Sequence, residues 1–231
     1  MKKLIIILFC FISLTSFAWE RYSDTTIFIS YSGGISFSSM KNFPAHEQRT
    51  GFGMRLNVEF KPSSEFLITG GFALSQYGYK YTSSLSDVLG NKFDTTINVA
   101  MQYIGVPVSV NYNLGRKFNP YIGVGFEPAI MISAREYAKL PETRNGIELN
   151  EHNINYMNQE YFKKFGFSVF AQGGIEYKLK QNISAFAEYK YSTMITKLYK
   201  QETIYGNNIK NKAWAVQVGL KWGIPITYKV Y

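Results

Sequence analysis

The chain is nearly free of cysteine, has few histidines and contains no long uninterrupted apolar run. Its one cysteine is Cys10, and its two histidines are His46 and His152. A disulfide framework needs paired cysteines, and a structural zinc site usually needs four cysteine or histidine ligands, so neither is expected. Beyond residue 18 no stretch approaches 18 consecutive apolar residues, which argues against membrane-spanning helices. We expect no cofactor and no metal.

The first residues have the three parts of a secretory signal peptide. Lys2 and Lys3 form a charged start, residues 4–12 form a short apolar run, and Ser16-Phe17-Ala18 offers small residues for cleavage. Nine apolar residues are too few to cross a bilayer as a helix, so we expect removal after Ala18 rather than anchoring. The prediction is a cleaved signal peptide over 1–18 and one exported domain over 19–231.

Apolar residues are present in strict alternation. Between Trp214 and Trp222 every second residue is bulky and apolar, which places Val216, Val218 and Leu220 on one face and small or polar residues on the other. A period of two indicates a β-strand with one apolar face. Eight steps of roughly 3.3 Å, tilted by about 40°, cover about 20 Å of an apolar band about 25 Å tall. The two tryptophans would then belong to the aromatic girdles of a membrane barrel.

The same alternation predicts eight strands without an interruption that would mark a second domain. They cover residues 25–37, 51–60, 65–81, 96–112, 120–134, 165–179, 183–198 and 212–223. The connections alternate between long (38–50, 82–95, 136–164 and 199–211) and short (61–64, 113–119 and 180–182). An up-and-down barrel with all long loops on one side gives this pattern, and it places both termini at the short-turn end, in the periplasm.

A soluble up-and-down barrel is the rival fold, because alternation alone does not say which face is inside. The polar faces decide between them, since they are rich in small residues: Ser30, Ser32, Gly34 and Ser36 in the first strand, and Gly123, Gly125, Glu127 and Ala129 in the fifth. Small residues suit the narrow interior of an eight-stranded barrel better than a solvated surface. We therefore predict an all-β fold, an eight-stranded antiparallel up-and-down transmembrane β-barrel of the outer membrane.

Two prolines, Pro107 and Pro128, fall inside predicted strands. Each removes one hydrogen-bond donor from the ladder, and a closed barrel has no free edge to accommodate them. We expect bulges or local irregularity at these positions.

Several short motifs resemble those of a known family. Tyr103-Ile104-Gly105-Val106-Pro107 is followed by Asn119-Pro120-Tyr121-Ile122-Gly123-Val124-Gly125-Phe126, and later by Gly173-Gly174-Ile175-Glu176-Tyr177 and Glu188-Tyr189-Lys190-Tyr191. This set resembles the PorT-like outer-membrane β-barrel family of Bacteroidetes, within the porin family of small OmpA/OmpX-type barrels, over about residues 25–224. The resemblance implies a barrel and carries over no catalytic or ligand residue. Some relatives are linked to type IX secretion.

Charged residues on the polar faces form the candidate site. Inside a narrow barrel such charges need partners, because burying an unpaired charge is expensive. We expect a structural network of ion pairs and hydrogen bonds that plugs the lumen, and a wet passage that selects small ions is the alternative. The predicted network consists of Arg55, Glu59, Glu127, Glu176, Lys178, Glu188, Lys190 and Lys221, with Trp214 and Trp222 as membrane girdle.

Three functions fit these features. The first is a non-enzymatic envelope protein whose long loops serve envelope structure, adhesion or docking, above all through the 29-residue segment 136–164. The second is a small-solute or ion porin. The third is a lipid-modifying enzyme, for which His46 lies near Ser38, Ser39 and Glu47, residue types that could form a catalytic triad. We expect no catalytic residue, and a solvated loop histidine is the simpler interpretation.

The expected partners follow from location and charge. The net charge is +9, or +7 once Lys2 and Lys3 are removed, which suits contact with the phosphates of outer-membrane lipid and lipopolysaccharide. The carboxy-terminal aromatic residue, Tyr231, resembles the signal read by the barrel-insertion machinery. A protein partner is possible at segment 136–164, and nucleic acid is not expected for an exported chain.

Overall fold

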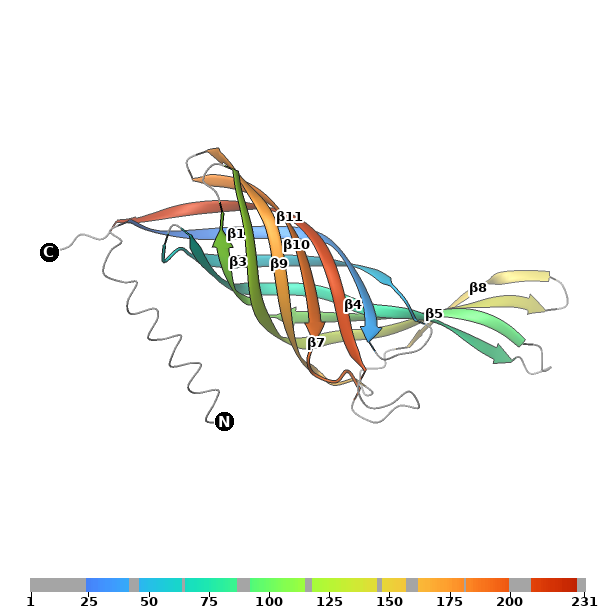
Figure 1. Ribbon diagram of the computed structural model, residues 1–231. Helices are drawn as coiled ribbons and strands as arrows, with labels where there is room; N and C mark the ends of the chain where they lie inside the picture. The colour runs from blue at the N-terminus through green and yellow to red at the C-terminus, as the bar shows by residue number, and fades with distance from the viewer. Residues whose placement is uncertain are drawn as a thin grey trace, which may run out of the picture.

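The computed structural model describes residues 24–41, 46–63, 65–86, 92–114, 118–144, 147–156, 162–180, 182–199 and 209–227. The described chain is built of β-strands (Figure 1). They are β1 (Asp24–Lys41), β2 (His46–Glu47), β3 (Arg49–Phe60), β4 (Phe66–Ser86), β5 (Lys92–Gly105), β6 (Val108–Asn113), β7 (Phe118–Arg144), β8 (Ile147–Tyr156), β9 (Phe165–Lys180), β10 (Ile183–Met194) and β11 (Lys210–Thr227).

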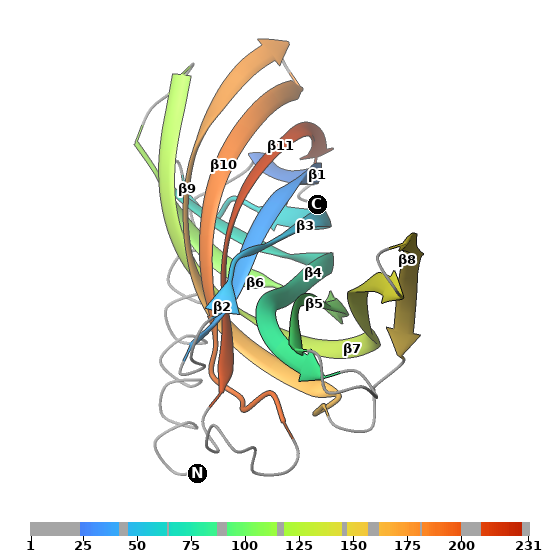
Figure 2. The same ribbon diagram turned by 90° about the vertical axis from the view of Figure 1, so that its right-hand side faces the viewer.

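The strands form a closed antiparallel ring. Neighbours in the chain pair with one another, and β1 pairs with β11 from Asp24↔Thr227 to Lys41↔Lys210, which closes the wall. Strands β5 and β6 both lie between β4 and β7 and act as one wall strand. Among the described residues the wall therefore has eight strands, as the alternation predicts, and Figure 2 shows their strong tilt.

The two prolines lie opposite each other at the break between β5 and β6. The Val106 N–H donates to the Pro128 carbonyl at 2.9 Å, but Pro128 has no N–H to return a bond. On the other side the Gly71 N–H donates to the Pro107 carbonyl at 3.2 Å, again without a return bond. The predicted irregularity is confirmed at Pro107, where the strand is interrupted between β5 and β6. At Pro128, by contrast, β7 continues without a break, because the interruption lies in the neighbouring β5–β6 strand instead.

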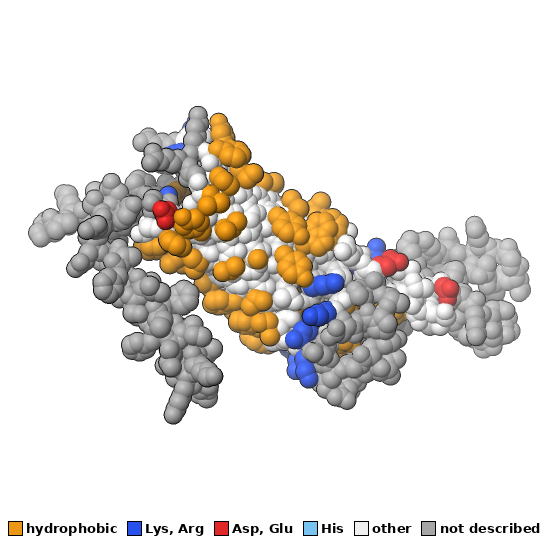
Figure 3. Space-filling view, in the orientation of Figure 1, with side chains coloured by type: hydrophobic (Ala, Val, Ile, Leu, Met, Phe, Trp, Pro, Cys, Tyr) orange, Lys and Arg blue, Asp and Glu red, His pale blue; other side chains and the backbone are white. Residues whose placement is uncertain are grey.

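The end of the barrel that holds Asp24 and Thr227, called here the terminal end, has its apolar residues outside. Val218, Phe72 and Val124 are 63–66% exposed, while Ser30 and Ser32 on the inward face are buried. Figure 3 shows the apolar side chains spread over the outer wall of this part. An outward apolar band around a polar interior is the arrangement of a protein whose wall contacts lipid.

At the opposite end, called here the hairpin end, the alternation is reversed. In β4 the outward residues change from Phe72 and Leu74 to Gln76 and Lys80, while the inward face gains Tyr77 and Tyr79. Gln76 is paired with Gln102 of β5, so neighbouring strands change at the same level. Beyond this level the wall has a polar outside and an apolar inside, as expected of a β-structure in water.

Much of the predicted long loops is strand. Strands β4 and β5 remain paired out to Ser86↔Lys92, and β7 continues to Arg144 and turns back as β8. Both hairpins project beyond the ring at the same end (Figure 1). The prediction of a 29-residue connection over 136–164 was wrong for this reason, since most of this segment is paired as the β7–β8 hairpin. Conversely, the predicted strand 183–198 is too long, because β10 ends at Met194.

The described residues include no helix long and apolar enough to span a membrane. The predicted signal peptide, residues 1–18, lies outside the described residues, as does Tyr231.

Candidate functional site

The inward-facing charges are arranged in three layers, the first of them near the terminal end. Lys221 of β11 lies between two carboxylates, with its Nζ atom 2.7 Å from an oxygen of Glu59 and 2.7 Å from one of Glu176. The Ser30 hydroxyl donates to the other Glu59 oxygen at 2.6 Å. Two acids thus share one lysine, which leaves this layer with a formal charge of −1.

The second layer is centred on Arg55 of β3. Its guanidinium group forms an ion pair with Glu188 of β10 and donates through Nε to the Gln217 side chain at 2.7 Å. Tyr121 of β7 donates to the second Glu188 oxygen at 2.9 Å. Both charged groups are buried, and their hydrogen-bonding atoms are held by partners from four different strands, which cross-links the interior of the ring.

The third layer pairs Lys190 of β10 with Glu127 of β7, at 2.7 Å. Glu127 is 1% exposed, and the Lys190 ammonium also lies 4.1 Å from the ring centre of Phe170. Gly105 makes room for the acid, because a Cβ at this position would lie 2.7 Å from a Glu127 carboxylate oxygen. Gly105, next to the β5–β6 break, is therefore required because any side chain at this position would collide with the Glu127 carboxylate.

Seven of the eight predicted network residues lie in these layers: Arg55, Glu59, Glu127, Glu176, Glu188, Lys190 and Lys221. Lys178 does not join them. It has the inward register of β9 and is paired with Ser184, but it is exposed where β9 reaches the terminal end. The alternation places a side chain on one face, whereas the height of that residue in the barrel decides whether it is buried.

The two predicted girdle tryptophans both face outward. Trp222 is 42% exposed near the terminal end, and Trp214 is partly covered by Phe37, whose ring centre lies 4.1 Å away in a stacked arrangement. Trp214 lies next to the level where the alternation reverses. Lys212 is the next outward residue of β11 toward the hairpin end.

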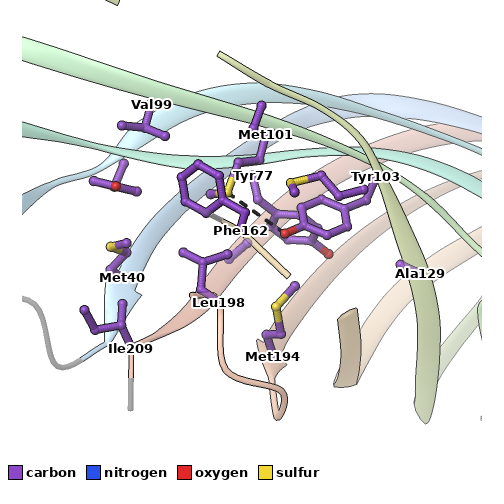
Figure 4. Close-up of a cluster of buried hydrophobic side chains, with 14 residues drawn as sticks. Met40, Tyr77, Val99, Met101, Tyr103, Ala129, Phe162, Met194, Leu198 and Ile209 are labelled. Atoms are coloured by element: carbon purple, nitrogen blue, oxygen red, sulfur yellow. Dashed lines mark hydrogen bonds between the residues drawn. The ribbon is translucent and has the colours of Figure 1, made fainter. Parts of the chain in front are cut away.

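Above the charged layers the lumen is filled by an apolar cluster that the sequence analysis missed (Figure 4). Met101, Tyr103 and Leu198 are among its fully buried side chains. Its members come from β1, β4, β5, β7, β10 and β11 and from the flanking segments: Met40, Tyr77, Tyr79, Val99, Met101, Tyr103, Ala129, Met131, Ala134, Phe162, Met194, Leu198, Ile209 and Ala213. The signal was present in the sequence as the run Tyr77, Tyr79 and Tyr81 on a face that is otherwise small or polar.

Two connecting segments close this cluster from the side. The Lys163 N–H donates to the Leu198 carbonyl at 2.8 Å, and the Leu198 N–H donates to the Ile209 carbonyl at 3.0 Å. Phe162 and Tyr199 form an isolated bridge between the same segments, with ring centres 5.1 Å apart. Leu198 after β10 and Ile209 before β11 thus place their side chains in the apolar cluster.

Tyrosines fix the hairpin end. The hydroxyl groups of Tyr79 and Tyr199 are 2.5 Å apart, and Tyr81 donates to Glu136 at 3.2 Å. Burial, followed by the charge interaction between the two hydroxyls, raises the pKa of Tyr79 far above its ordinary value. Burial likewise raises the pKa of Tyr199. Both phenols are therefore neutral donors or acceptors throughout the ordinary pH range.

Both serines considered for catalysis are buried in β1. The Ser38 hydroxyl is buried and donates to the Gly78 carbonyl at 2.9 Å, and Ser39 is also buried. His46 and Glu47 form the short strand β2, paired with Tyr81 and Lys80 of β4. The described side chains include no group of three acids, histidines or cysteines suited to a metal ion.

The barrel interior therefore has a polar half and an apolar half. Residues of the first two charged layers line a small cavity together with Asn57, Thr69 and Asn111, and the apolar cluster lies between this cavity and the hairpin end. Along β11 the inward residues change from Lys221 and Gln217 to Ala213, and Ile209 directly before the strand is also buried in the apolar cluster, with the buried Asn211 between the two. Ions need a continuous polar path, and the described lumen is interrupted by buried methionine, tyrosine and leucine.

These features define an integral membrane protein of the outer-membrane barrel class, with a lipid-facing wall and a filled lumen. The chain belongs to the outer membrane protein beta-barrel domain family, whose model matches residues 6–221. Its location is accordingly the outer membrane. No curated protein sequence matches the chain.

Solved structures with a similar fold are distant in sequence. Neisserial surface protein A is 11% identical, with 85% of this chain and 96% of that chain covered and a TM-score of 0.49. The attachment invasion locus protein Ail of Yersinia pestis, solved with the heparin analogue sucrose octasulfate, is 13% identical over 87% of this chain and all of that chain, with a TM-score of 0.42. OprG from Pseudomonas aeruginosa is 12% identical over 87% and 96%, with a TM-score of 0.41.

Proposed function

We propose that this protein is a sealed, non-enzymatic outer-membrane scaffold that holds the β4–β5 and β7–β8 hairpins outside the cell for docking or adhesion. The observation that carries the proposal is the division of the lumen, with three charged layers at the terminal end and an apolar cluster at the hairpin end. A filled lumen supports rigid display rather than transport. We further propose that it belongs to the PorT-like group of Bacteroidetes barrels, on the motifs around Pro107 and Pro120.

Rigid display is supported by the way the hairpins are joined to the ring. Strand β5 pairs with β7 up to Ile97↔Ala138, so the two hairpins continue as one sheet beyond the level of Gln76 and Gln102. Arg49 of β3 ties this sheet to the ring by donating to the Asn98 side chain at 3.0 Å. A partner would therefore meet a preformed surface and would not need to order a loop on binding.

The orientation is tested by labelling single cysteines in intact cells. Thr82→Cys places a thiol on an exposed position of the β4–β5 hairpin, and Asn182→Cys places one in the exposed turn between β9 and β10. We expect a membrane-impermeant maleimide to label the first variant on whole cells and the second only after the outer membrane is permeabilised. The reverse pattern would place the hairpins in the periplasm and overturn the proposal.

The absence of transport is tested with the refolded protein in a planar bilayer. We expect no conductance steps from barrels whose folding has been verified by their heat-dependent migration. Uniform steps that change when Glu127 or Lys190 is reversed in charge would instead establish the ion-channel alternative.

Docking is tested by shortening the longer hairpin in register. Lys139 and Asn153 are paired, so joining them through Asn-Gly removes the outer part of β7 and β8 and leaves the wall intact. A photocrosslinking residue at position 82 should yield one discrete surface adduct in the parent, and the shortened variant should lose it. Equal adducts in both proteins would exclude β7–β8 as the docking element.

A further inference from the structure

Seven basic side chains form a one-sided rim at the hairpin end. Each lies within four positions of the nearest outward apolar residue of its segment: Lys212 lies two positions from Trp214, Lys164 directly precedes Phe165, and Lys197 lies two positions after Ile195. Figure 3 shows lysine and arginine side chains gathered along the border of the apolar surface. The basic rim consists of Lys41, Arg135, Lys163, Lys164, Lys197, Lys210 and Lys212.

The rim places like charges beside each other. Lys41 of β1 is directly paired with Lys210 of β11. The hydrogen bond from the Lys163 N–H to the Leu198 carbonyl brings the Lys163–Lys164 segment beside Lys197. Like charges directly opposite across a sheet are destabilising, so each of these positions favours an anion that binds between the two amines.

Among the described residues, the opposite side of the barrel carries no comparable outward rim at the same level, since Arg49 of β3 is engaged with Asn98 and the Tyr77 carbonyl. Strands β3, β4 and β5 carry Thr50, Gln76 and Gln102 there, and Lys80 is paired in register with Glu47. A need for solubility would distribute charge around the ring. A positive rim confined to the side of β7, β9, β10, β11 and β1 indicates a specific anionic neighbour.

We propose that the basic rim binds the phosphate groups of lipid A in the outer leaflet of the membrane. The rim lies where the apolar wall ends, which is the height of lipid headgroups, and lysine stems can lie along the apolar wall while their amines meet phosphate. The assignment of the leaflet rests on the orientation in the proposed function. Phosphate binding itself depends only on the rim.

The test is a titration of the full-length refolded protein in nonionic detergent with fluorescently labelled lipopolysaccharide that retains its lipid A phosphates. An amine near an anionic lipid surface contributes about a fivefold gain in affinity. We expect Lys41→Gln with Lys210→Gln, and separately Lys164→Gln with Lys197→Gln, to weaken binding by about 25-fold. Lys80→Gln is the matched control, and its affinity should stay within about twofold of the parent.

Two outcomes would overturn the proposal. One is unchanged affinity in both double variants. The other is equal binding of phosphatidylglycerol at the same phosphate concentration, which would assign the rim to anionic phospholipid in general. Because the titration is done in detergent, it is independent of membrane orientation. A failure of the cysteine labelling and a failure of lipid binding are therefore distinguishable.

A stability measurement keeps the test valid if a variant folds poorly. In nonionic detergent alone, Lys41→Gln with Lys210→Gln removes a repulsion and should not lower the urea midpoint. With lipopolysaccharide present the parent should gain stability and the variant should gain much less. A variant less stable than the parent by the same amount in both conditions would show a purely structural role and would refute lipid binding at this pair.

Discussion

Removing one partner of the Arg55–Glu188 pair should destabilise the barrel severely. Glu188→Gln keeps the shape of the side chain and removes its charge, which leaves a buried guanidinium group with only neutral partners. Breaking a buried ion pair in this way typically costs about 3–5 kcal/mol. Because Gln217 still accepts from the Arg55 Nε at 2.7 Å, we place the cost at the lower end, about 3 kcal/mol.

A double variant measures how strongly the stabilising effects of Arg55 and Glu188 depend on each other. Arg55→Met combined with Glu188→Gln removes both charges, and it should recover at least half of the loss seen in Glu188→Gln alone, because no unpaired charge remains. The assay is reversible urea unfolding of the protein in detergent, followed by tryptophan fluorescence. Single variants that lose less than about 1 kcal/mol, or losses that simply add in the double variant, would refute the view that these charges depend on each other.

Three further predictions address the lumen and the hairpin end. Gly105→Ala should lower the free energy of unfolding by about 1–3 kcal/mol through contact with the Glu127 carboxylate, while Gly70→Ala, whose added Cβ meets nothing within 4 Å, should be neutral in the same urea assay. Leu198→Ala should cost about 2–5 kcal/mol because it leaves a cavity in the apolar cluster, and a thermal shift within error would show that this segment does not pack there. Stability should fall as the pH rises above about 10, since Tyr79 ionises in the unfolded chain but not when folded; Tyr79→Phe should flatten this decline, and an unchanged slope in pH-dependent unfolding would contradict it.

The wall of the barrel was predictable from the sequence because each strand carries the signal locally. At the terminal end the predicted and observed strand ends agree within a few residues, and Pro107 marks the break between β5 and β6. The alternation also placed Arg55 and Glu188 on the inward face without any information about their contact. Which acid meets which base depends on the shear of the ring, and that is set by the closure between β1 and β11.

The hairpin end was less predictable, because the apolar residues of the alternating pattern face inward there and outward at the terminal end. Ile97, Val99 and Met101 look like a lipid-facing stripe, yet they point inward, since the wall has left the apolar band at Gln102. Period two identifies a strand in lipid and in water alike, but which face is apolar depends on the surrounding solvent.

The closure of β1 on β11 has a consequence for assembly. These two strands are joined at the start and the end of the described chain, so one seam depends on contacts separated by nearly the whole sequence. While the exported chain folds, β1 offers an unpaired edge until β11 pairs with it, and such an edge can pair with other chains. Any shortened product that lacks β11 would leave β1 and β10 open together. Pairing of β11 with both β1 and β10 therefore removes the last free edges of the wall, and a chain without β11 cannot close.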